Sequence, residues 1–280
     1  MQNDKNMKEL VREKYAEIAT QSKTQNETSC CGAGCGCSTI DYAIMSDDYT
    51  SLEGYFAEAD LGLGCGLPTE YAQIKKGDTV VDLGSGAGND AFIARSIVGE
   101  DGRVIGIDMT ETMIDLARKN AAKLKLENVE FRLGDIEKIP ISNNKADVVV
   151  SNCVLNLVPD KLKAFIEMYR ILKPGGHFSV SDIVLVGNLP ESIVKEAEMY
   201  AGCVSGAIQK NDYLSMISNA GFTKVEINKE KAITIPDEIL SNYLNADQLQ
   251  DFKDSKTGIF SITVYGEKAK DCGCGTECCN

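Results

Sequence analysis

The sequence lacks the features that would suit a membrane-spanning segment or a nucleic-acid partner. It contains no run of about 18 apolar residues, the length that a membrane-spanning helix needs. Its 29 lysines and arginines are outnumbered by 42 aspartates and glutamates, and the net charge of -13 repels a phosphate backbone. Residues 1–20 alternate charged and apolar side chains and do not look like a signal peptide. We therefore expect a soluble, cytoplasmic protein with neither nucleic acid nor membrane as a partner.

Among the reactive side chains, histidine is scarce and cysteine is abundant. The one histidine, His177, begins an apolar segment away from the cysteines, and we expect a structural role for it. Eight of the 11 cysteines lie in two terminal clusters, at 30–37 and 272–279, and three are solitary. A chain of 280 residues with 43% hydrophobic content can bury a core without disulfides, and the cytosol keeps most thiols reduced. The solitary cysteines therefore need a chemical explanation.

Short apolar strands alternate with amphipathic helices in the middle of the chain. Strands are expected at 79–83, 103–107, 129–133, 146–150 and 177–183, and helices at 91–98, from Thr110 to 125 and at 160–172. This order predicts a mostly parallel sheet with helices on both faces. Outside this region we expect helices at 7–20, 191–200, 212–220 and within 236–251, and closing strands at 222–227 and 258–266.

Four parts follow from this pattern. Residues 1–45 would form an N-terminal helix and a mobile Cys-rich segment, and residues 46–185 a nucleotide-binding domain. Residues 186–270 would supply a lid insertion and the closing strands, and residues 271–280 a flexible Cys-rich tail. For the tail cysteines, capture of a metalloid and a dispensable soft-metal sponge remain equal alternatives.

A glycine-rich turn follows the first expected strand. Residues 80–88 read VVDLGSGAG, which places glycines where a strand turns into a helix and a ligand approaches backbone amides. Asp108 ends the next strand, where a carboxylate can accept both hydroxyl hydrogens of a ribose. Position 89 is asparagine and the spacing departs from the dinucleotide fingerprint, which disfavours an NAD enzyme. The turn and the acid together predict a nucleoside-containing cofactor.

The motif series resembles that of class I S-adenosylmethionine-dependent methyltransferases. The motifs are DLGSGAG at 82–88, Gly134-Asp135, Ser151-Asn152 and LKPGG at 172–176. The resemblance implies a Rossmann-like α/β sheet, mostly parallel with an antiparallel closing strand, a lid insertion, and S-adenosylmethionine as cofactor. The implied cofactor residues are Asp82, Gly84, Ser85, Gly86 and Gly88 for the methionine portion, Asp108 for the ribose, Met109, Asp135 and Ile136 for the adenine, and Asn152 beside them. Core packing remains an equal alternative for Met109.

The three solitary cysteines are Cys65, Cys153 and Cys203. Cys65 lies in a glycine-rich loop before the first strand, Cys153 follows the fourth strand, and Cys203 lies in the expected lid. Ligands of open α/β sheets bind at the carboxyl ends of the strands, and small neighbours are expected to leave each side chain exposed. A single cysteine is usually a small buried hydrophobe. Three cysteines around one site instead favour a shared set of sulfur ligands.

Over most of its length the chain resembles the arsenite methyltransferases. The loop at 64–69, the Asn152-Cys153 pair and Cys203 are similar to the arsenic-binding thiols of that family. The resemblance implies arsenite or methylarsenite as substrate in arsenic detoxification, with Cys65, Cys153 and Cys203 as catalytic residues and arsenic ligands. Thiolates are soft ligands that suit trivalent arsenic, and three sulfurs leave its lone pair free to attack an activated methyl group.

Methyl transfer oxidises arsenic from trivalent to pentavalent, so each cycle needs two electrons. We expect Cys65 to form a transient disulfide with an N-terminal cysteine, either Cys31 or Cys37, while Cys153 and Cys203 hold the arsenic. Thioredoxin or glutathione would restore the thiols. Two rivals remain at this point, a carbon or oxygen methyltransferase of the ubiquinone-biosynthesis type and a non-enzymatic metalloid-binding protein.

Overall fold

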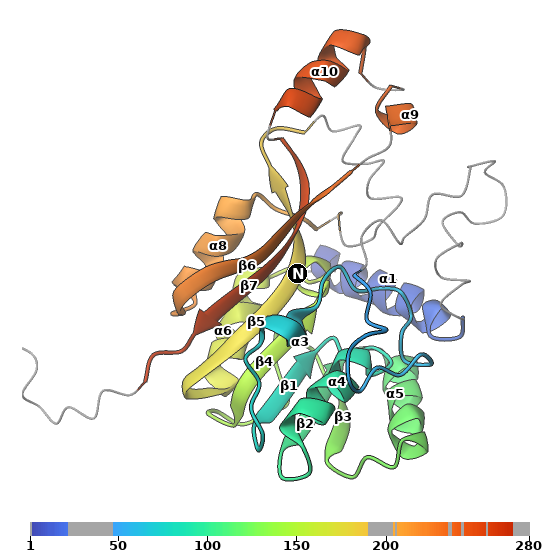
Figure 1. Ribbon diagram of the computed structural model, residues 1–280, viewed down its shortest axis with the longest axis vertical. Helices are drawn as coiled ribbons and strands as arrows, with labels where there is room; N and C mark the ends of the chain where they lie inside the picture. The colour runs from blue at the N-terminus through green and yellow to red at the C-terminus, as the bar shows by residue number, and fades with distance from the viewer. Residues whose placement is uncertain are drawn as a thin grey trace, which may run out of the picture.

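Seven strands form one twisted sheet in the computed structural model (Figure 1). The structure describes residues 2–21, 47–189, 204, 206–234, 237–241, 244–255 and 257–270. The strands are β1 (Thr79–Leu83), β2 (Arg103–Asp108), β3 (Val129–Leu133), β4 (Ala146–Asn152), β5 (Leu172–Val186), β6 (Thr223–Ile233) and β7 (Gly258–Glu267). Their order in the sheet is β3-β2-β1-β4-β5-β7-β6.

The first five strands run parallel to one another, and β7 runs antiparallel to both β5 and β6. The expected mostly parallel sheet with an antiparallel closing strand is therefore confirmed. Side chains that alternate along β1 enter two separate cores, because neighbouring residues of a strand point to opposite faces. Val81 and Leu83 join the core beneath one face, and Val80 joins the core beneath the other.

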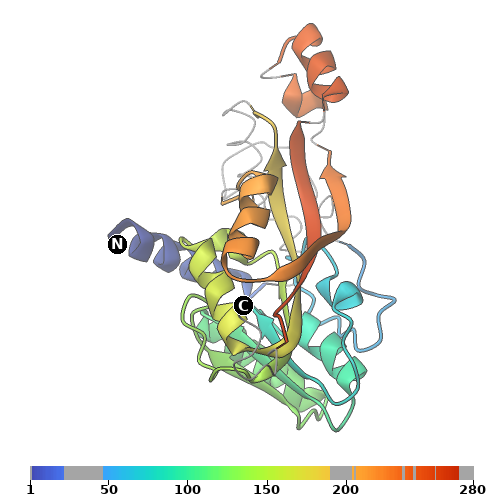
Figure 2. The same ribbon diagram turned by 90° about the vertical axis from the view of Figure 1, so that its left-hand side faces the viewer.

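The helices cover both faces and extend beyond the sheet. They are α1 (Gln2–Ile18), α3 (Pro68–Tyr71), α4 (Asn89–Val98), α5 (Glu111–Lys123), a 3-10 turn η2 (Leu155–Leu157), α6 (Lys161–Ile171), α8 (Lys210–Asn219), α9 (Asp237–Leu240) and α10 (Ala246–Asp254). The buried faces of α6 and α8 share one core, and those of α4 and α5 share the other. The long strands β5, β6 and β7 reach past β1 to β4, with α10 at their far end (Figure 2).

The sequence predicted the positions of these strands and helices better than their ends. β5 begins at Leu172 instead of 177, because Leu172 already pairs with Ala146 before a register shift in β4. Thr110 precedes α5 as expected, although its side chain makes no capping hydrogen bond. The expected helix at 191–200 and both cysteine clusters lie outside the described residues. None of the described helices combines the length and apolar character that crossing a membrane requires.

Candidate active site

The strand ends of the cofactor half open into a cavity of about 1020 Å³, part of it open to solvent. Most of the expected cofactor residues line this cavity. They are Asp82, Gly84, Ser85, Gly86, Asp108, Met109, Asp135, Ile136 and Asn152. The motif series therefore converges on one space, as parallel strands that end at the same edge of a sheet require.

Two glycines of the turn at 84–88 serve different purposes. Gly86 has φ +49°, and a Cβ at this position would meet nothing within 4 Å. Its backbone therefore faces open space, which a ligand can approach closely. Gly88 has φ +102° and caps α4, and a Cβ there would come within 2.9 Å of the rings of Phe92 and Phe131. Gly88 has a packing role and is not among the residues that line the cavity, and its expected contact with the cofactor stays a prediction.

Asp108 is held by the main chain around it. Its Oδ2 accepts a hydrogen bond from the Gly86 amide at 3.0 Å, and its Oδ1 accepts one from the Thr110 amide at 2.8 Å. Burial raises the pKa of Asp108, and these hydrogen bonds oppose the rise because they stabilise the carboxylate. Asp108 also lines the cavity, so its carboxylate is held where it can accept hydroxyl hydrogens of a ligand.

Two buried acids, Asp82 and Asp90, line the cavity. Burial, reinforced by the charges of Asp90 and Asp108, raises the pKa of Asp82 well above its ordinary value. Burial also raises the pKa of Asp90 to about 6. The Oδ2 of Asp82 is buried without a hydrogen-bond partner, and no described lysine or arginine forms an ion pair with either acid. Such a cavity fits S-adenosylmethionine, because its ammonium and sulfonium groups would compensate the buried charge.

The helix α1 closes one side of the cavity. Its Lys8 Nζ contacts Asp135 Oδ2 at 2.6 Å and Glu137 Oε2 at 2.8 Å, and Val11 and Tyr15 also line the cavity. A cofactor role for α1 was not predicted from the sequence. The spacing of 8, 11 and 15 puts these side chains on one helical face and was the available signal.

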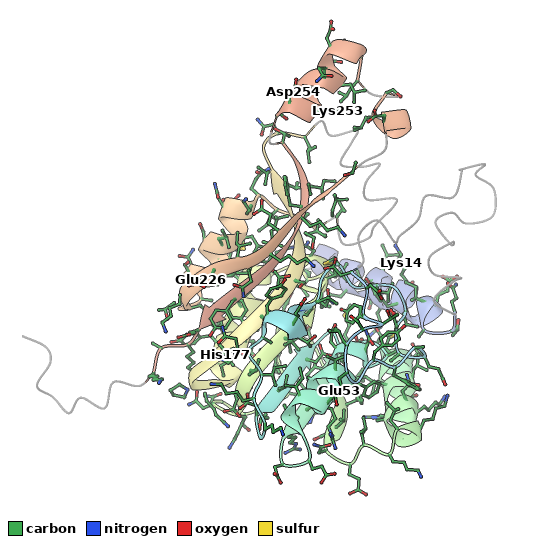
Figure 3. All side chains as sticks on the ribbon, in the orientation of Figure 1. Lys14, Glu53, His177, Glu226, Lys253 and Asp254 are labelled. Carbon is green, nitrogen blue, oxygen red and sulfur yellow. A yellow bond between two sulfur atoms is a disulfide. The ribbon has the colours of Figure 1, made fainter. Side chains whose placement is uncertain are left out.

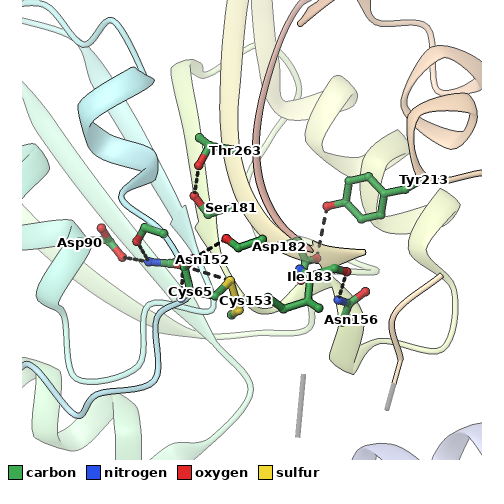
Figure 4. Close-up of a disulfide and its surroundings, with 12 residues drawn as sticks. Cys65, Asp90, Asn152, Cys153, Asn156, Ser181, Asp182, Ile183, Tyr213 and Thr263 are labelled. Carbon is green, nitrogen blue, oxygen red and sulfur yellow. Dashed lines mark hydrogen bonds between the residues drawn. A yellow bond between two sulfur atoms is a disulfide. The ribbon is translucent and has the colours of Figure 1, made fainter. Parts of the chain in front are cut away.

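Cys65 and Cys153 are joined by a disulfide, with Cα atoms 5.8 Å apart, and Cys153 lines the cavity (Figure 4). Their side chains are only 2% and 4% exposed, in an apolar cluster with Ile183 and Val204. One expectation is thereby corrected: the small neighbours do not expose these cysteines, because β5 and β7 cover the loop. Cys65 is bonded to Cys153 in this structure, and the expected transient disulfide between Cys65 and an N-terminal cysteine stays a prediction.

The remaining cysteines of the expected site, Cys203, Cys31 and Cys37, lie outside the described residues. His177 lies within β5 (Figure 3), where its Nε2 is 2.6 Å from the carbonyl oxygen of Ala72. Its ring packs against Tyr265 at 5.3 Å, which agrees with the expected structural role.

The side chains that hold the Cys65 loop come from three separate parts of the chain and were not predicted from the sequence. Asn152 hydrogen-bonds to the main chain on both sides of the Cys65 Cα atom, Tyr49 contacts the carbonyl oxygen of Gly66, and Ser261 donates to the carbonyl oxygen of Cys65. These residues come from distant parts of the chain, and no local motif marks Tyr49 or Ser261.

Comparison with known proteins identifies the class and then the family. The sequence model of a methyltransferase domain matches residues 74–221, which cover the cofactor half and α8. An arsenite methyltransferase of Halobacterium salinarum is 44% identical over 79% of this chain and 58% of its own length. One of Aquipseudomonas alcaligenes is 31% identical over 85% of this chain and 68% of its own length.

A solved structure agrees with these relatives. The arsenic(III) S-adenosylmethionine methyltransferase of Chlamydomonas reinhardtii superposes with a TM-score of 0.62, at 33% identity, over 82% of this chain and 73% of that one. The chain therefore belongs to the arsenite methyltransferase family, whose members use S-adenosylmethionine. It spans less than two thirds of the Halobacterium relative.

Proposed function

We propose that the protein transfers a methyl group from S-adenosylmethionine to trivalent arsenic, as arsenite or methylarsenite, bound by cysteine sulfurs. The observation that carries the proposal is a pair of sulfurs, those of Cys65 and Cys153, in bonding contact at the wall of a cofactor cavity lined by buried acids. Family membership supports the same substrate. A carbon or oxygen methyltransferase has no need of such a pair.

Each part of the site has a task in this reaction. In the reduced protein, Cys65 and Cys153 supply two thiolates to arsenic and Cys203 supplies the third, which leaves the arsenic lone pair directed away from the sulfurs. When bound, S-adenosylmethionine supplies a methyl group activated by the sulfonium charge. The apolar cluster around the two cysteines, with Ile183, Val204 and Ile259, excludes water from the substrate. No proton acceptor is required in the transfer.

The same sulfurs can balance the electrons. The arsenic lone pair forms the new bond to carbon, and the electrons of the broken carbon–sulfur bond remain on the departing thioether. Arsenic is then formally pentavalent. Coupling of the Cys65 and Cys153 sulfurs into a disulfide breaks their two bonds to arsenic and returns two electrons to it, and exchange with glutathione thiols releases the trivalent methylated product from Cys203. An external dithiol system, thioredoxin or glutathione, reduces the disulfide.

This proposal divides the chain by task. Residues 46–185 hold the cofactor, and residues 186–270 cover the arsenic side, with the cysteine clusters at 30–37 and in the tail as accessory thiols. The chemistry depends on reduced thiols, which the cytoplasm maintains, and we place the protein there.

The test is direct. Reduced protein is incubated with arsenite, S-adenosylmethionine and glutathione, and the arsenic species are separated and quantified. Methylated arsenic is expected, and Cys65→Ser or Cys153→Ser should lower the rate by about 100-fold because arsenic loses its positioning.

Cofactor affinity provides the matched control, since neither serine variant removes a cavity acid. Both variants should bind S-adenosylmethionine as the unmodified protein does. Arsenic binding without any methylated product, at every thiol concentration, would refute the proposal in favour of a metalloid-binding protein. Full activity in both serine variants would refute the thiol assignment.

A further inference from the structure

The side chain of Asn152 holds the main chain of the Cys65 loop on two sides (Figure 4). Its Oδ1 accepts a hydrogen bond from the Cys65 amide at 3.1 Å, and its Nδ2 donates to the carbonyl oxygen of Gly66 at 2.8 Å. Ser261 Oγ donates to the carbonyl oxygen of Cys65 at 2.5 Å. Both main-chain polar groups of Cys65 are therefore held by side chains from β4 and β7.

Asn152 is in turn oriented by a carboxylate. Its Nδ2 donates to Asp90 Oδ2 at 3.1 Å, and the hydroxyl of Tyr49 lies 3.2 Å from the same oxygen and 2.9 Å from the carbonyl oxygen of Gly66. An ionised carboxylate only accepts hydrogen bonds. Together with the Gly66 carbonyl oxygen, which also only accepts, it favours the amide orientation that points Nδ2 at Asp90 and leaves Oδ1 for the Cys65 amide. A neutral Asp90 accepts more weakly from Nδ2, so its contribution to holding the amide is reduced.

Asp90 also lines the cofactor cavity. The ionisable groups that face it are Asp82 from β1, Asp60 from the loop before α3, and the hydroxyl of Tyr49. All are acids, and no described lysine or arginine forms an ion pair with Asp90. Burial raises its pKa to about 6, so its ionised form is costly in the empty cavity. A cationic cofactor reverses this cost, because an opposite charge nearby favours the carboxylate.

We propose that Asp90 is a positioning residue through which the bound cofactor fixes the main chain of Cys65. The path runs from the cavity to Asp90, from Asp90 to the amide of Asn152, and from that amide to the Cys65 N–H. The inference rests on the proposed function in taking the cavity as the cofactor site and Cys65 as an arsenic ligand. Its consequence is that the thiol loop becomes ordered when the methyl donor is present.

The first test measures hydrogen exchange at the Cys65 amide in the reduced full-length protein, with and without saturating S-adenosylmethionine. The unmodified protein should exchange about fivefold more slowly with the cofactor, the effect of one strengthened hydrogen bond. Asp90→Asn keeps the shape of the side chain but cannot ionise, and it should lose this slowing at saturation. Steric shielding by the cofactor would survive the substitution, so an unchanged fivefold effect in Asp90→Asn would overturn the proposal.

Asp182→Asn is the matched control, because Asp182 is a buried carboxylate on the other side of the disulfide and makes no bond to Asn152. The Cys65 amide of Asp182→Asn should still exchange about fivefold more slowly when the cofactor is bound. Tyr49→Phe removes only a hydroxyl and serves if Asp90→Asn does not fold. It should show a smaller slowing than the unmodified protein, and an equal one would count against the path.

The second test measures S-adenosylmethionine affinity by calorimetry at pH 5.5 and pH 8. Because the cation binds the ionised form, affinity should rise with pH, by about fourfold for a group with a pKa of about 6. The S-adenosylmethionine affinity of Asp90→Asn should lack this fourfold rise with pH, whereas that of Asp182→Asn should retain it. Identical pH dependence in Asp90→Asn and the unmodified protein would overturn the proposal. Neither test contains arsenic, so failure of arsenic methylation and failure of this coupling remain distinguishable.

Discussion

Two buried carboxylates, Asp90 and Asp182, flank the Cys65–Cys153 pair, and their surroundings differ (Figure 4). Asp182, on β5, accepts hydrogen bonds from the Ile183 amide at 2.9 Å and the Tyr213 hydroxyl at 3.2 Å. The charge of Lys161 also favours its ionised form. Asp90, on α4, has only neutral donors and faces the cavity. Burial raises the pKa of Asp182 to about 7 and that of Asp90 to about 6.

The difference between the surroundings of Asp90 and Asp182 indicates the role of each acid. An unpaired buried charge is costly, and proteins normally neutralise it or supply partners. Asp182 receives its partners from the protein itself, including a cation, and its position away from the cavity suits a structural role. Asp82 and Asp90 receive no cation from the described part of the chain. A cationic ligand in the cavity would supply the missing partner and favour their ionised forms.

The largest expected effect comes from removing an unpaired cavity acid. Asp82→Asn should lower the affinity for S-adenosylmethionine by about 10- to 100-fold, because a hydrogen bond to a charged group contributes about 1.5–3 kcal/mol. Asp182→Asn should change that affinity less than about twofold, because its charge lies outside the cavity. Calorimetric titration of both variants checks this. The apo form of Asp82→Asn should also melt no lower than the unmodified protein, since the substitution removes repulsion from Asp90 and Asp108. Equal affinities of the two variants would contradict the comparison.

The next largest expected effect is a change in the free energy of unfolding with pH. The pKa of Asp182 is about 7 when folded, against 3.8 as its ordinary value. Its contribution to stability is therefore fully present below about pH 4, and it is lost as the pH rises through about 7. Between pH 5.5 and pH 8 the loss amounts to about 2 kcal/mol, and Asp182→Asn should remove it. Urea unfolding at both pH values measures the difference.

Bound cofactor should change the pH-dependent stability contribution of Asp90 and leave that of Asp182 unchanged. The corresponding contribution of Asp90 should disappear when S-adenosylmethionine is present at saturation, because the cation keeps that acid ionised in the fold. The contribution of Asp182 should persist. If saturating cofactor abolished both, the two acids would not differ as the structure indicates.

The sequence predicted the cofactor half well because its signals are local. A strand, a turn and a helix within 79–98 define the cavity wall, and Asp108 follows at the end of the next strand. Residues 172–176 contain proline and glycines, which local rules interpret as a turn. In the structure they continue β5, because pairing with β4 begins at Leu172 and Gly175 bonds to Lys268.

The thiol side was less predictable because its contacts are long-range. Cys65 and Cys153 are 88 residues apart, and connectivity cannot be deduced from spacing when eleven cysteines are present. Ser261 lies still further from Cys65 along the chain, and Asp90 reaches the loop only through Asn152. The three-dimensional fold was needed to distinguish a buried, clamped sulfur pair from exposed loop cysteines.

A smaller effect is expected within the Asp182 network. Tyr213→Phe removes one of the hydrogen bonds to a buried carboxylate and should lower the free energy of unfolding by about 1 kcal/mol. Cofactor affinity should not change, because Tyr213 does not line the cavity. Urea unfolding and calorimetry together check both parts. A loss of cofactor affinity without a loss of stability would mean that Tyr213 and Asp182, rather than Asp90, belong to the cofactor site.

The smallest effect concerns the rim of the cavity, where acids do have a cation. Lys8 bridges Asp135 and Glu137 with side-chain exposures of 25%, 41% and 9%. Partly exposed ion pairs contribute about 0.2–1 kcal/mol, so Lys8→Ala should weaken S-adenosylmethionine binding by about two- to fivefold through looser docking of α1. Lys224→Ala is the matched control, because Lys224 is 67% exposed and pairs with Glu267 away from the cavity. It should leave the affinity unchanged. A loss as large as that of Asp82→Asn would mean that the rim, rather than the buried acids, dominates cofactor binding.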